Sequence, residues 1–162
     1  MPGYLQTKLM VVRTGANEIH FAEFDRWAEP LDEGIARMLK AALGSTGRVE
    51  SVGSNLNGGG PLDYEVNVRV RACEGVLGES GKDGNGSIRL VMAWEIQPTG
   101  TNETTIKRGG FTAAPAAWDG KDYGQLALQL SQAIARAGAA LAQDLPGQVP
   151  APETSNPGVT SP

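Results

Sequence analysis

The chain offers few side chains for catalysis, because its 162 residues include one histidine, His20, and one cysteine, Cys73. Residues two apart in a strand share a face, so Glu18 and His20 could form an acid–base pair. A solvated pair on a surface strand is the commoner outcome. Cys73 could also form a thiolate dyad with His20, but no helix start that would activate a thiol is near it in sequence. We expect no catalytic residue, and a buried Cys73 that packs as a small hydrophobe.

Motifs for cofactors and metals are incomplete. The glycine-rich residues 58–61 lack both the Lys-Ser/Thr pair of a phosphate-binding loop and the strand–glycine–helix order of a dinucleotide site. The Asp-Gly-Asn-Gly run at residues 83–86 lacks the spacing and the closing glutamate of a calcium loop. One histidine and one cysteine argue against a zinc site. We therefore expect neither a cofactor nor a metal.

Composition predicts one globular domain, because 40% of the residues are hydrophobic and the length suits a single core. The net charge is −4, and the basic residues are scattered along the sequence. Scattered charge argues against a nucleic-acid partner and against a polybasic membrane patch. No segment has the ~20 apolar residues of a membrane-spanning helix, and no signal peptide opens the chain. We expect a domain over residues 1–145 and a disordered Pro/Gly/Ser/Thr tail over 146–162.

Two strands and a helix are predicted in the first third of the chain. Residues 7–13 and 17–24 have strand composition, and the glycine and asparagine between them suit a hairpin turn. Apolar residues then recur at helical spacing, which predicts a helix over 30–43. Pro30 suits its first turn, and Gly44 stops it. The acidic residues of its first turn suit the helix dipole better than a metal. They are Glu29, Asp32 and Glu33.

The middle of the chain predicts a sheet and the end predicts a second helix. Polar and apolar residues alternate over 62–71, which is typical of an antiparallel strand with one wet face. A second alternating strand is predicted over 87–97, where Val91 and Ala93 share the face of Arg89 and Glu95. Weaker strands are expected at 48–53 and 104–113. An apolar stripe predicts a helix over 120–144, capped by Asp119 with Asp122 in a capping box. The predicted fold class is α+β, a mostly antiparallel sheet of about five strands with two helices packed on one face.

One turn is distinctive. Residues 26–31, Arg-Trp-Ala-Glu-Pro-Leu, join the second strand to the first helix. A structural role accounts for this turn: Trp27 would cover the edge of the core and Arg26 would lie over a carboxylate or an aromatic ring. The same turn resembles the hallmark of the ABC-type transport auxiliary lipoprotein family (PqiC/YmbA-like proteins). The Pro-Gly-Tyr-Leu start, the alternating strand near 62–72, Trp94 and the last helix are also similar to that family.

The resemblance implies a non-catalytic periplasmic accessory component of an ABC-type lipid-transport system. The implied partner is an MCE-domain protein that carries lipids between two membranes, and the implied role supports outer-membrane integrity. The implied anchor is a lipidated N-terminal cysteine, which together with its signal peptide would precede Met1. Two alternatives stay open: a small ligand-binding domain or enzyme that uses a cleft between sheet and helices, and a structural subunit that forms homo-oligomers.

Partner contacts are expected at two places. The wet face of the predicted sheet carries Arg69, Arg71 and Arg89, and the distinctive turn carries Arg26 and Trp27. Solvated strand faces share this appearance, so the assignment rests on the resemblance as well as on the residues.

Overall fold

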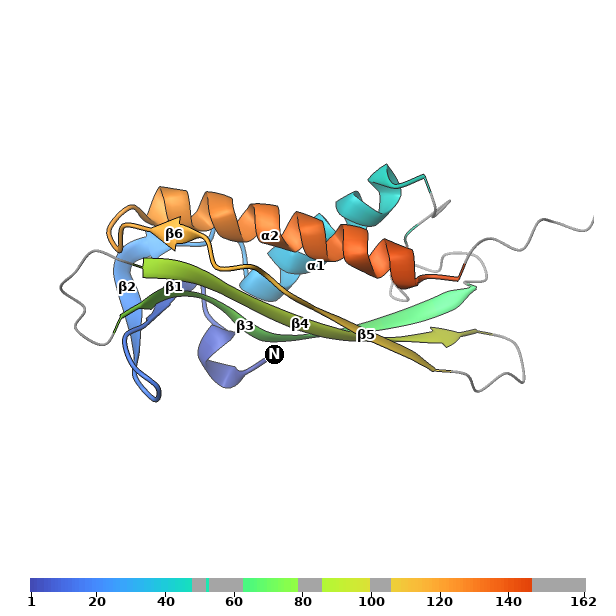
Figure 1. Cartoon of the computed structure of the whole chain (residues 1–162), viewed down its shortest axis with the longest axis horizontal. Coiled ribbons are helices and arrows are strands. Elements are labelled where there is room, and N and C mark those ends of the chain that lie inside the picture. The colour runs from blue at the N-terminus through green and yellow to red at the C-terminus, as the bar shows by residue number, and fades with distance from the viewer. Residues whose placement is uncertain (48–51, 53–62, 79–85, 100–105, 147–162) are drawn as a thin grey trace, which may run out of the picture.

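The computed structural model describes residues 1–47, 52, 63–78, 86–99 and 106–146. Two helices lie on one face of a mostly antiparallel sheet, which confirms the predicted α+β class (Figure 1). The predicted strand at 48–53 lies outside the described residues except for Val52, and so does the predicted tail beyond Pro146. The elements are η1 (Gly3–Leu5), β1 (Leu9–Arg13), β2 (Ile19–Arg26), α1 (Leu31–Ser45), β3 (Tyr64–Leu77), β4 (Gly86–Pro98), β5 (Lys107–Thr112), β6 (Ala117–Trp118) and α2 (Tyr123–Asp144).

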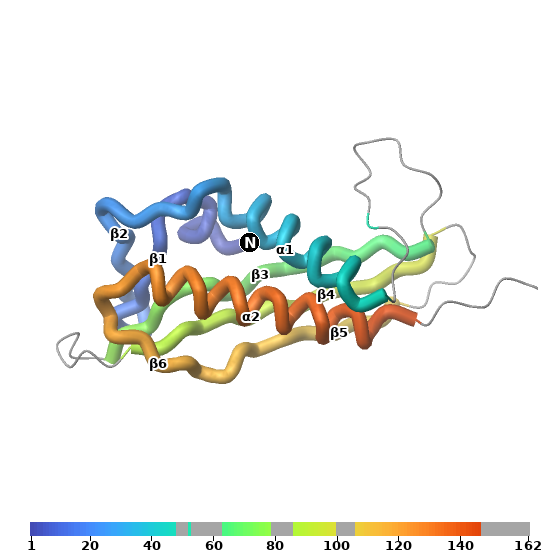
Figure 2. Tube along the Cα trace, turned by 90° about the horizontal axis from the view of Figure 1, so that it is seen from above, coloured from blue at the N-terminus to red at the C-terminus, as the bar shows by residue number. Residues whose placement is uncertain are grey.

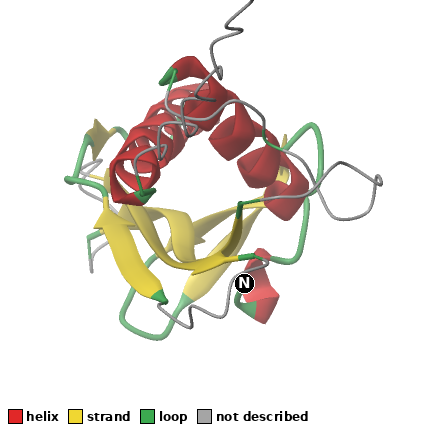
Figure 3. Cartoon of the chain, turned by 90° about the vertical axis from the view of Figure 1, so that its right-hand side faces the viewer, coloured by secondary structure: helices red, strands yellow, loops and turns green. Residues whose placement is uncertain are grey.

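The strands follow the order β2-β1-β3-β4-β5, and β6 pairs with the first residues of β4. All pairs are antiparallel except β1 and β3, which run parallel with Val12 opposite Gly75. The helices cover one face of the sheet, here called the inner face, and η1 lies on the opposite, outer face (Figure 3). Seen from above, α1 and α2 run side by side along the sheet (Figure 2).

The β3–β4 hairpin is the longest part of the sheet and extends well past the predicted end at residue 71. The register shifts between Val70, opposite Met92, and Ala72, opposite Val91, so Arg71 is an inserted residue. Such a β-bulge reverses which positions of a strand face the core. The sequence prediction ended at Arg71 because the alternation breaks there, although pairing continues to Leu77.

Helix α1 also ends later than predicted. The helix continues through Gly44 to Ser45, and the chain leaves it at Gly47, whose φ of +66° is a left-handed conformation that suits glycine. Pro30 precedes the first helical residue and occupies the cap position. The predicted stripe is buried at Leu31, Ile35, Leu39 and Leu43.

Helix α2 is capped differently from the prediction. The Asp122 carboxylate accepts a hydrogen bond from the Gln125 backbone N–H at 2.9 Å, so Asp122 is the N-cap residue. Asp119 instead accepts from the backbone N–H groups of Lys121 and Asp122, each at 2.8 Å, and orders the turn before the helix. The capping box centred on Asp119 was therefore wrong by one turn.

Replacing Asp122 with alanine should lower the free energy of unfolding by about 1 kcal/mol, because the Gln125 N–H would lose its partner. Urea denaturation followed by circular dichroism measures this change. Asp122→Asn is the matched control, since its side-chain oxygen can still accept from Gln125 and should retain most of the stability. Equal losses in both variants would contradict the capping role.

Trp118 joins the sheet to the start of α2. Its indole is 2% exposed, and its Nε1 donates to the Asp122 carbonyl at 2.7 Å. A Cβ at Gly75 or Gly86 would lie 2.8 Å or 2.9 Å from the indole ring, so these two glycines make the space that the ring occupies. The strand that carries Trp118, β6, was not predicted, because two residues are too short for a periodic pattern.

Trp94 anchors the other end of α2. Its Nε1 donates to Asp144 Oδ2 at 2.9 Å, and Lys107 Nζ lies 3.4 Å from Asp144 Oδ1. Gly109 lies opposite Trp94 in β5, where any Cβ would collide with the indole and with Asp144. Gly109 therefore lies inside β5 because the bulky Trp94 needs room, and the Gly109-Gly110 pair does not interrupt the strand.

Candidate functional site

The two predicted dyads do not form a reactive site. His20 Nε2 and Glu18 Oε1 are 3.3 Å apart, but their side chains are 63% and 66% exposed, so the pair is solvated. Cys73 is buried in β3 and belongs to the hydrophobic core. Burial, with a smaller contribution from Glu74, raises the pKa of the Cys73 thiol to about 12. The thiol is therefore neutral near pH 7, as expected for a small core residue.

The folded protein should react very slowly with Ellman's reagent at pH 8 and rapidly in 8 M urea, because only unfolding exposes Cys73. The rate of thionitrobenzoate release measures this difference.

The raised pKa of Cys73 also makes the stability of the fold depend on pH. The thiol of the unfolded chain ionises near its usual pKa of about 8.5, while the thiol of the folded chain stays neutral. Stability should therefore fall as the pH rises from about 9 toward 12, and Cys73→Ala should remove that component. Fast labelling of folded protein would contradict the burial.

The three carboxylates around the start of α1 do not converge. Glu29 Oε1 accepts a hydrogen bond from Arg37 Nε at 3.0 Å, while Asp32 and Glu33 are exposed in the first helical turn. Across the described residues, no group of three or more His, Cys, Asp or Glu side chains is placed to hold a metal ion. Within the same described ranges, no helix is both long and apolar enough to cross a membrane.

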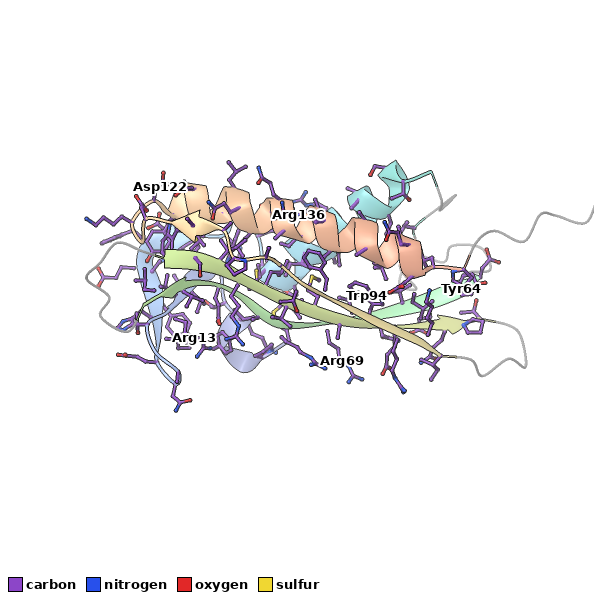
Figure 4. The ribbon with its side chains drawn as sticks, viewed as in Figure 1. Arg13, Tyr64, Arg69, Trp94, Asp122 and Arg136 are labelled. Atoms are coloured by element: carbon purple, nitrogen blue, oxygen red, sulfur yellow. The ribbon has the colours of Figure 1, made fainter. Side chains whose placement is uncertain are left out.

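Charged side chains gather on the outer face of the sheet instead. They come from strands distant in sequence, and the arginines outnumber the glutamates, whereas the whole chain has a net charge of −4. Arg13 and Arg69 point away from the helices (Figure 4). We name this surface the outer arginine face; it comprises Arg13, Arg69, Arg71, Arg89 and Arg108 with Glu65, Glu74 and Glu95.

A buried carboxylate organises one end of the outer arginine face. Glu74 is fully buried, and its Oε1 accepts from Arg13 Nε at 2.8 Å and from Arg89 Nη1 at 3.4 Å. Its other oxygen, Oε2, is buried and accepts no hydrogen bond from the described residues. The Arg13 guanidinium carbon lies 5.9 Å from the centre of the Tyr4 ring, within cation–π range.

Tyr4 connects this end of the face to the N-terminal turn η1. Partial burial, then the nearby Glu74 carboxylate, raises the pKa of Tyr4, while the hydrogen bond to Glu74 raises the pKa of Arg13. Tyr4 is therefore neutral and Arg13 is charged at neutral pH, and both pKa values lie further from neutrality than usual. Leu5, the next residue, is 1% exposed, so η1 is held against the sheet by packing as well as by charge.

A second carboxylate organises the other end. Glu95 Oε1 accepts from Arg108 Nε at 3.1 Å, and Glu95 Oε2 lies 3.9 Å from Arg69 Nη2. Here the arginine side chains are 72% exposed and Glu95 is 28% exposed, so this cluster is open to solvent. Arg71 lies at the bulge between the two clusters and forms no ion pair with the described residues.

Small side chains separate the two clusters on β4 and β5. Ala93 is paired with Gly110, and Val91 with Thr112. Ala93 and Val91 are half-buried, while the arginines at either end project into solvent. A strip of short side chains therefore crosses the outer arginine face, with one arginine cluster on each side of it.

Comparison with protein families gives a match over most of the chain. Residues 1–142 match the model of the family described as "ABC-type transport auxiliary lipoprotein component". The chain belongs to this family. No curated protein matches the chain.

Solved structures agree with the fold of this auxiliary lipoprotein family member. The crystal structure of protein XCC0632 from Xanthomonas campestris, described under the family model DUF330, is 15% identical with a TM-score of 0.72. The match covers 87% of this chain and 75% of that one. A crystal structure described as an uncharacterized protein is 22% identical, with a TM-score of 0.65 and coverage of 88% and 84%. At these identities the likeness shows a shared fold.

In this transport auxiliary component, the predicted contact residues lie in two separate places. Arg69, Arg71 and Arg89 lie together on the outer arginine face. Arg26 is exposed at the end of edge strand β2, with β1 between it and β3. The Trp27 side chain is half-buried against the core, which confirms its predicted structural role. The backbone N–H of Trp27 donates to the Lys8 carbonyl at 2.7 Å.

The sequence prediction missed much of the outer arginine face. Arg13 and Arg108 were not chosen, since one ends a short strand and the other lies beside the two glycines of β5. Glu74 was missed because the bulge at Arg71 changes the face of the sheet on which the following residues of β3 lie. One signal was available: a glutamate within the apolar run from Ala72 to Leu77 requires a cationic partner if the run is buried.

Proposed function

We propose that this protein is a periplasmic accessory component of an ABC-type lipid-transport system of the MCE class, and that it supports outer-membrane integrity. Family membership over residues 1–142 carries this proposal, because the family is a transport auxiliary lipoprotein component. We also propose an N-terminal lipid anchor in the outer membrane and a single α+β domain over residues 1–145. Membrane fractionation of the native gene product, with and without replacement of its lipidated cysteine, tests the anchor.

We further propose that the protein acts by binding rather than by catalysis. Buried apolar side chains from β4 and α2, including Leu90, Leu126 and Leu130, occupy the space between the sheet and the helices. The one cysteine is neutral and the one histidine is solvated. These observations favour an accessory role over the alternative of a ligand-binding or catalytic cleft.

The contact residues proposed for an MCE-domain partner are Arg69, Arg71 and Arg89 on the outer arginine face, with Arg26 and Trp27 at the turn before α1. In the first group, Arg69 and Arg89 are exposed and lie within ion-pair distance of a carboxylate, and Arg71 is exposed between them. For the second group, Arg26 is the solvent-exposed member. Homo-oligomer formation is kept as a separate proposal, which light scattering of the purified protein tests.

The test is a pull-down of the MCE-domain protein from the same transport system by the purified, folded chain. We expect retention of that protein, and cells lacking this gene should be more sensitive to detergent. No retention at any salt concentration, together with unchanged detergent sensitivity, would overturn the proposed transport role. Retention that is unaffected by Arg26→Ala and Trp27→Phe would remove only the turn from the contact surface.

A further inference from the structure

We infer that the outer arginine face binds an extended, acidic segment of a protein partner. This inference deepens the proposed function, on which it rests, by naming the chemistry of the partner. Among the described residues of β1, β3, β4 and β5, five arginines and three glutamates share one face of a chain whose net charge is −4, so this part of the sheet is positive where the molecule as a whole is negative. A positive face on a negative protein favours an acidic partner and orients its approach.

The two glutamate-centred clusters prepare the arginines for binding. Glu74 neutralises one of the two arginines that it contacts, Arg13 and Arg89, so the cluster keeps one positive charge. Glu95 does the same for Arg69 and Arg108. The carboxylates also restrict the arginine side chains, which lowers the entropy lost when a ligand binds. Arg71, between the clusters, adds a cation that no described carboxylate neutralises.

The shape of the face suits an extended peptide. Arg69 and Arg71 are exposed and lie two positions apart on β3, with Arg71 at the bulge. Alternate side chains of an extended peptide recur about every 6–7 Å along it. Alternate carboxylates of an extended segment could therefore reach both arginines. The half-buried Val91 and Ala93, with Gly110, leave room for the backbone of such a segment.

A flat anionic membrane fits the face less well. The membrane surface would contact the arginine tips and leave the strip of small side chains uncovered. It would also meet Glu65 and Glu95, which share the face and would repel its phosphates. An extended peptide can place its own side chains between these glutamates, so we assign the face to a protein segment.

Fluorescence anisotropy with a fluorescein-labelled peptide of six Glu-Thr repeats tests the inference on the full chain. The charge-reversal variant Arg69→Glu/Arg71→Glu alters two exposed side chains, and circular dichroism checks its folding. Arg136→Glu on α2, on the side of the molecule away from Arg69, is the matched control (Figure 4). We expect the native chain and Arg136→Glu to bind with similar affinity and the double variant to bind at least about tenfold more weakly. Binding of the native chain should also weaken as salt rises.

Other outcomes overturn the inference. A Lys-Thr repeat peptide that binds equally, or a double variant that binds as well as Arg136→Glu, would contradict an acidic-segment site. Binding of phosphatidylglycerol vesicles but not of the Glu-Thr peptide would reassign the face to a membrane surface. If the MCE-domain partner is retained in the pull-down equally by the native chain and the double variant, this inference fails and Arg69 and Arg71 are removed from the proposed contact residues, while the proposed transport role stands.

Discussion

Replacing Arg13 with methionine should lower the free energy of unfolding by about 3 kcal/mol, because it leaves the fully buried Glu74 carboxylate without its closest partner. Arg89 lies farther from Glu74 Oε1, at 3.4 Å, and is about half exposed, so it compensates only in part. Glu74 Oε2 accepts no hydrogen bond from the described residues, which makes the Arg13 contact more important. Urea denaturation measures the loss.

The double variant Arg13→Met/Glu74→Met separates the lost charge pair from lost packing. Replacing both members removes the buried charge, so this variant should recover most of the stability lost by Arg13→Met alone. Arg37→Met is the matched control, because Arg37 pairs with a partly exposed Glu29 on the protein surface and should change stability by less than about 1 kcal/mol. A double variant that is less stable than Arg13→Met would show that side-chain packing, rather than charge, dominates.

Replacing Trp118 with alanine should cost about 4 kcal/mol, since it leaves a cavity between β3, β4 and the start of α2. The indole N–H donated to the Asp122 carbonyl is also lost. Trp118→Phe keeps an aromatic ring and should cost clearly less. Thermal and urea denaturation of both variants measure the two losses.

Gly75 provides a sharper test of the Trp118 contact. Gly75→Ala alone should destabilise by about 2 kcal/mol, because its Cβ would lie 2.8 Å from Trp118 Cζ3. In a Trp118→Ala background that collision disappears, so the same substitution should cost little or even fill part of the cavity. Equal costs in the two backgrounds would mean that Leu126, whose Cδ2 would lie 3.1 Å from the same Cβ, and not the ring determines the cost.

Local patterns predicted most of the fold. The spacing of apolar residues was sufficient to identify the buried residues of two elements. These are the helical stripe around Ile35 and Leu39 and the alternating strand over 87–97. The errors lie where one element adapts to another. The bulge at Arg71 lets β3 continue past its alternating pattern, and Gly109 is inside a strand because Trp94 lies opposite. Such adjustments depend on contacts between distant residues, which a local pattern does not contain.

The candidate site was predictable only in part. Arg69 and Arg89 belong to strands with clear alternation, so their wet faces could be assigned from the sequence. Their grouping with Arg13 and Arg108 depends on strand order, and on the parallel pairing of β1 with β3 in particular. The sequence prediction treated the basic residues as scattered, which is true along the chain and not true across the sheet.

The parallel pairing of β1 and β3 also has a consequence for how the chain folds. Strand β1 lies inside the sheet, yet its contact with β3, including the Arg13–Glu74 pair, spans 61 residues. Non-local pairing of this kind forms slowly, because a long loop must close, at a cost in entropy, before the contact contributes any stabilising free energy. If the chain becomes available for folding from its N-terminus, the β1–β2 hairpin would come first and keep an unpaired edge until the residues up to Leu77 have followed. We therefore expect β3 and β4 to fold first and β1 to join them late.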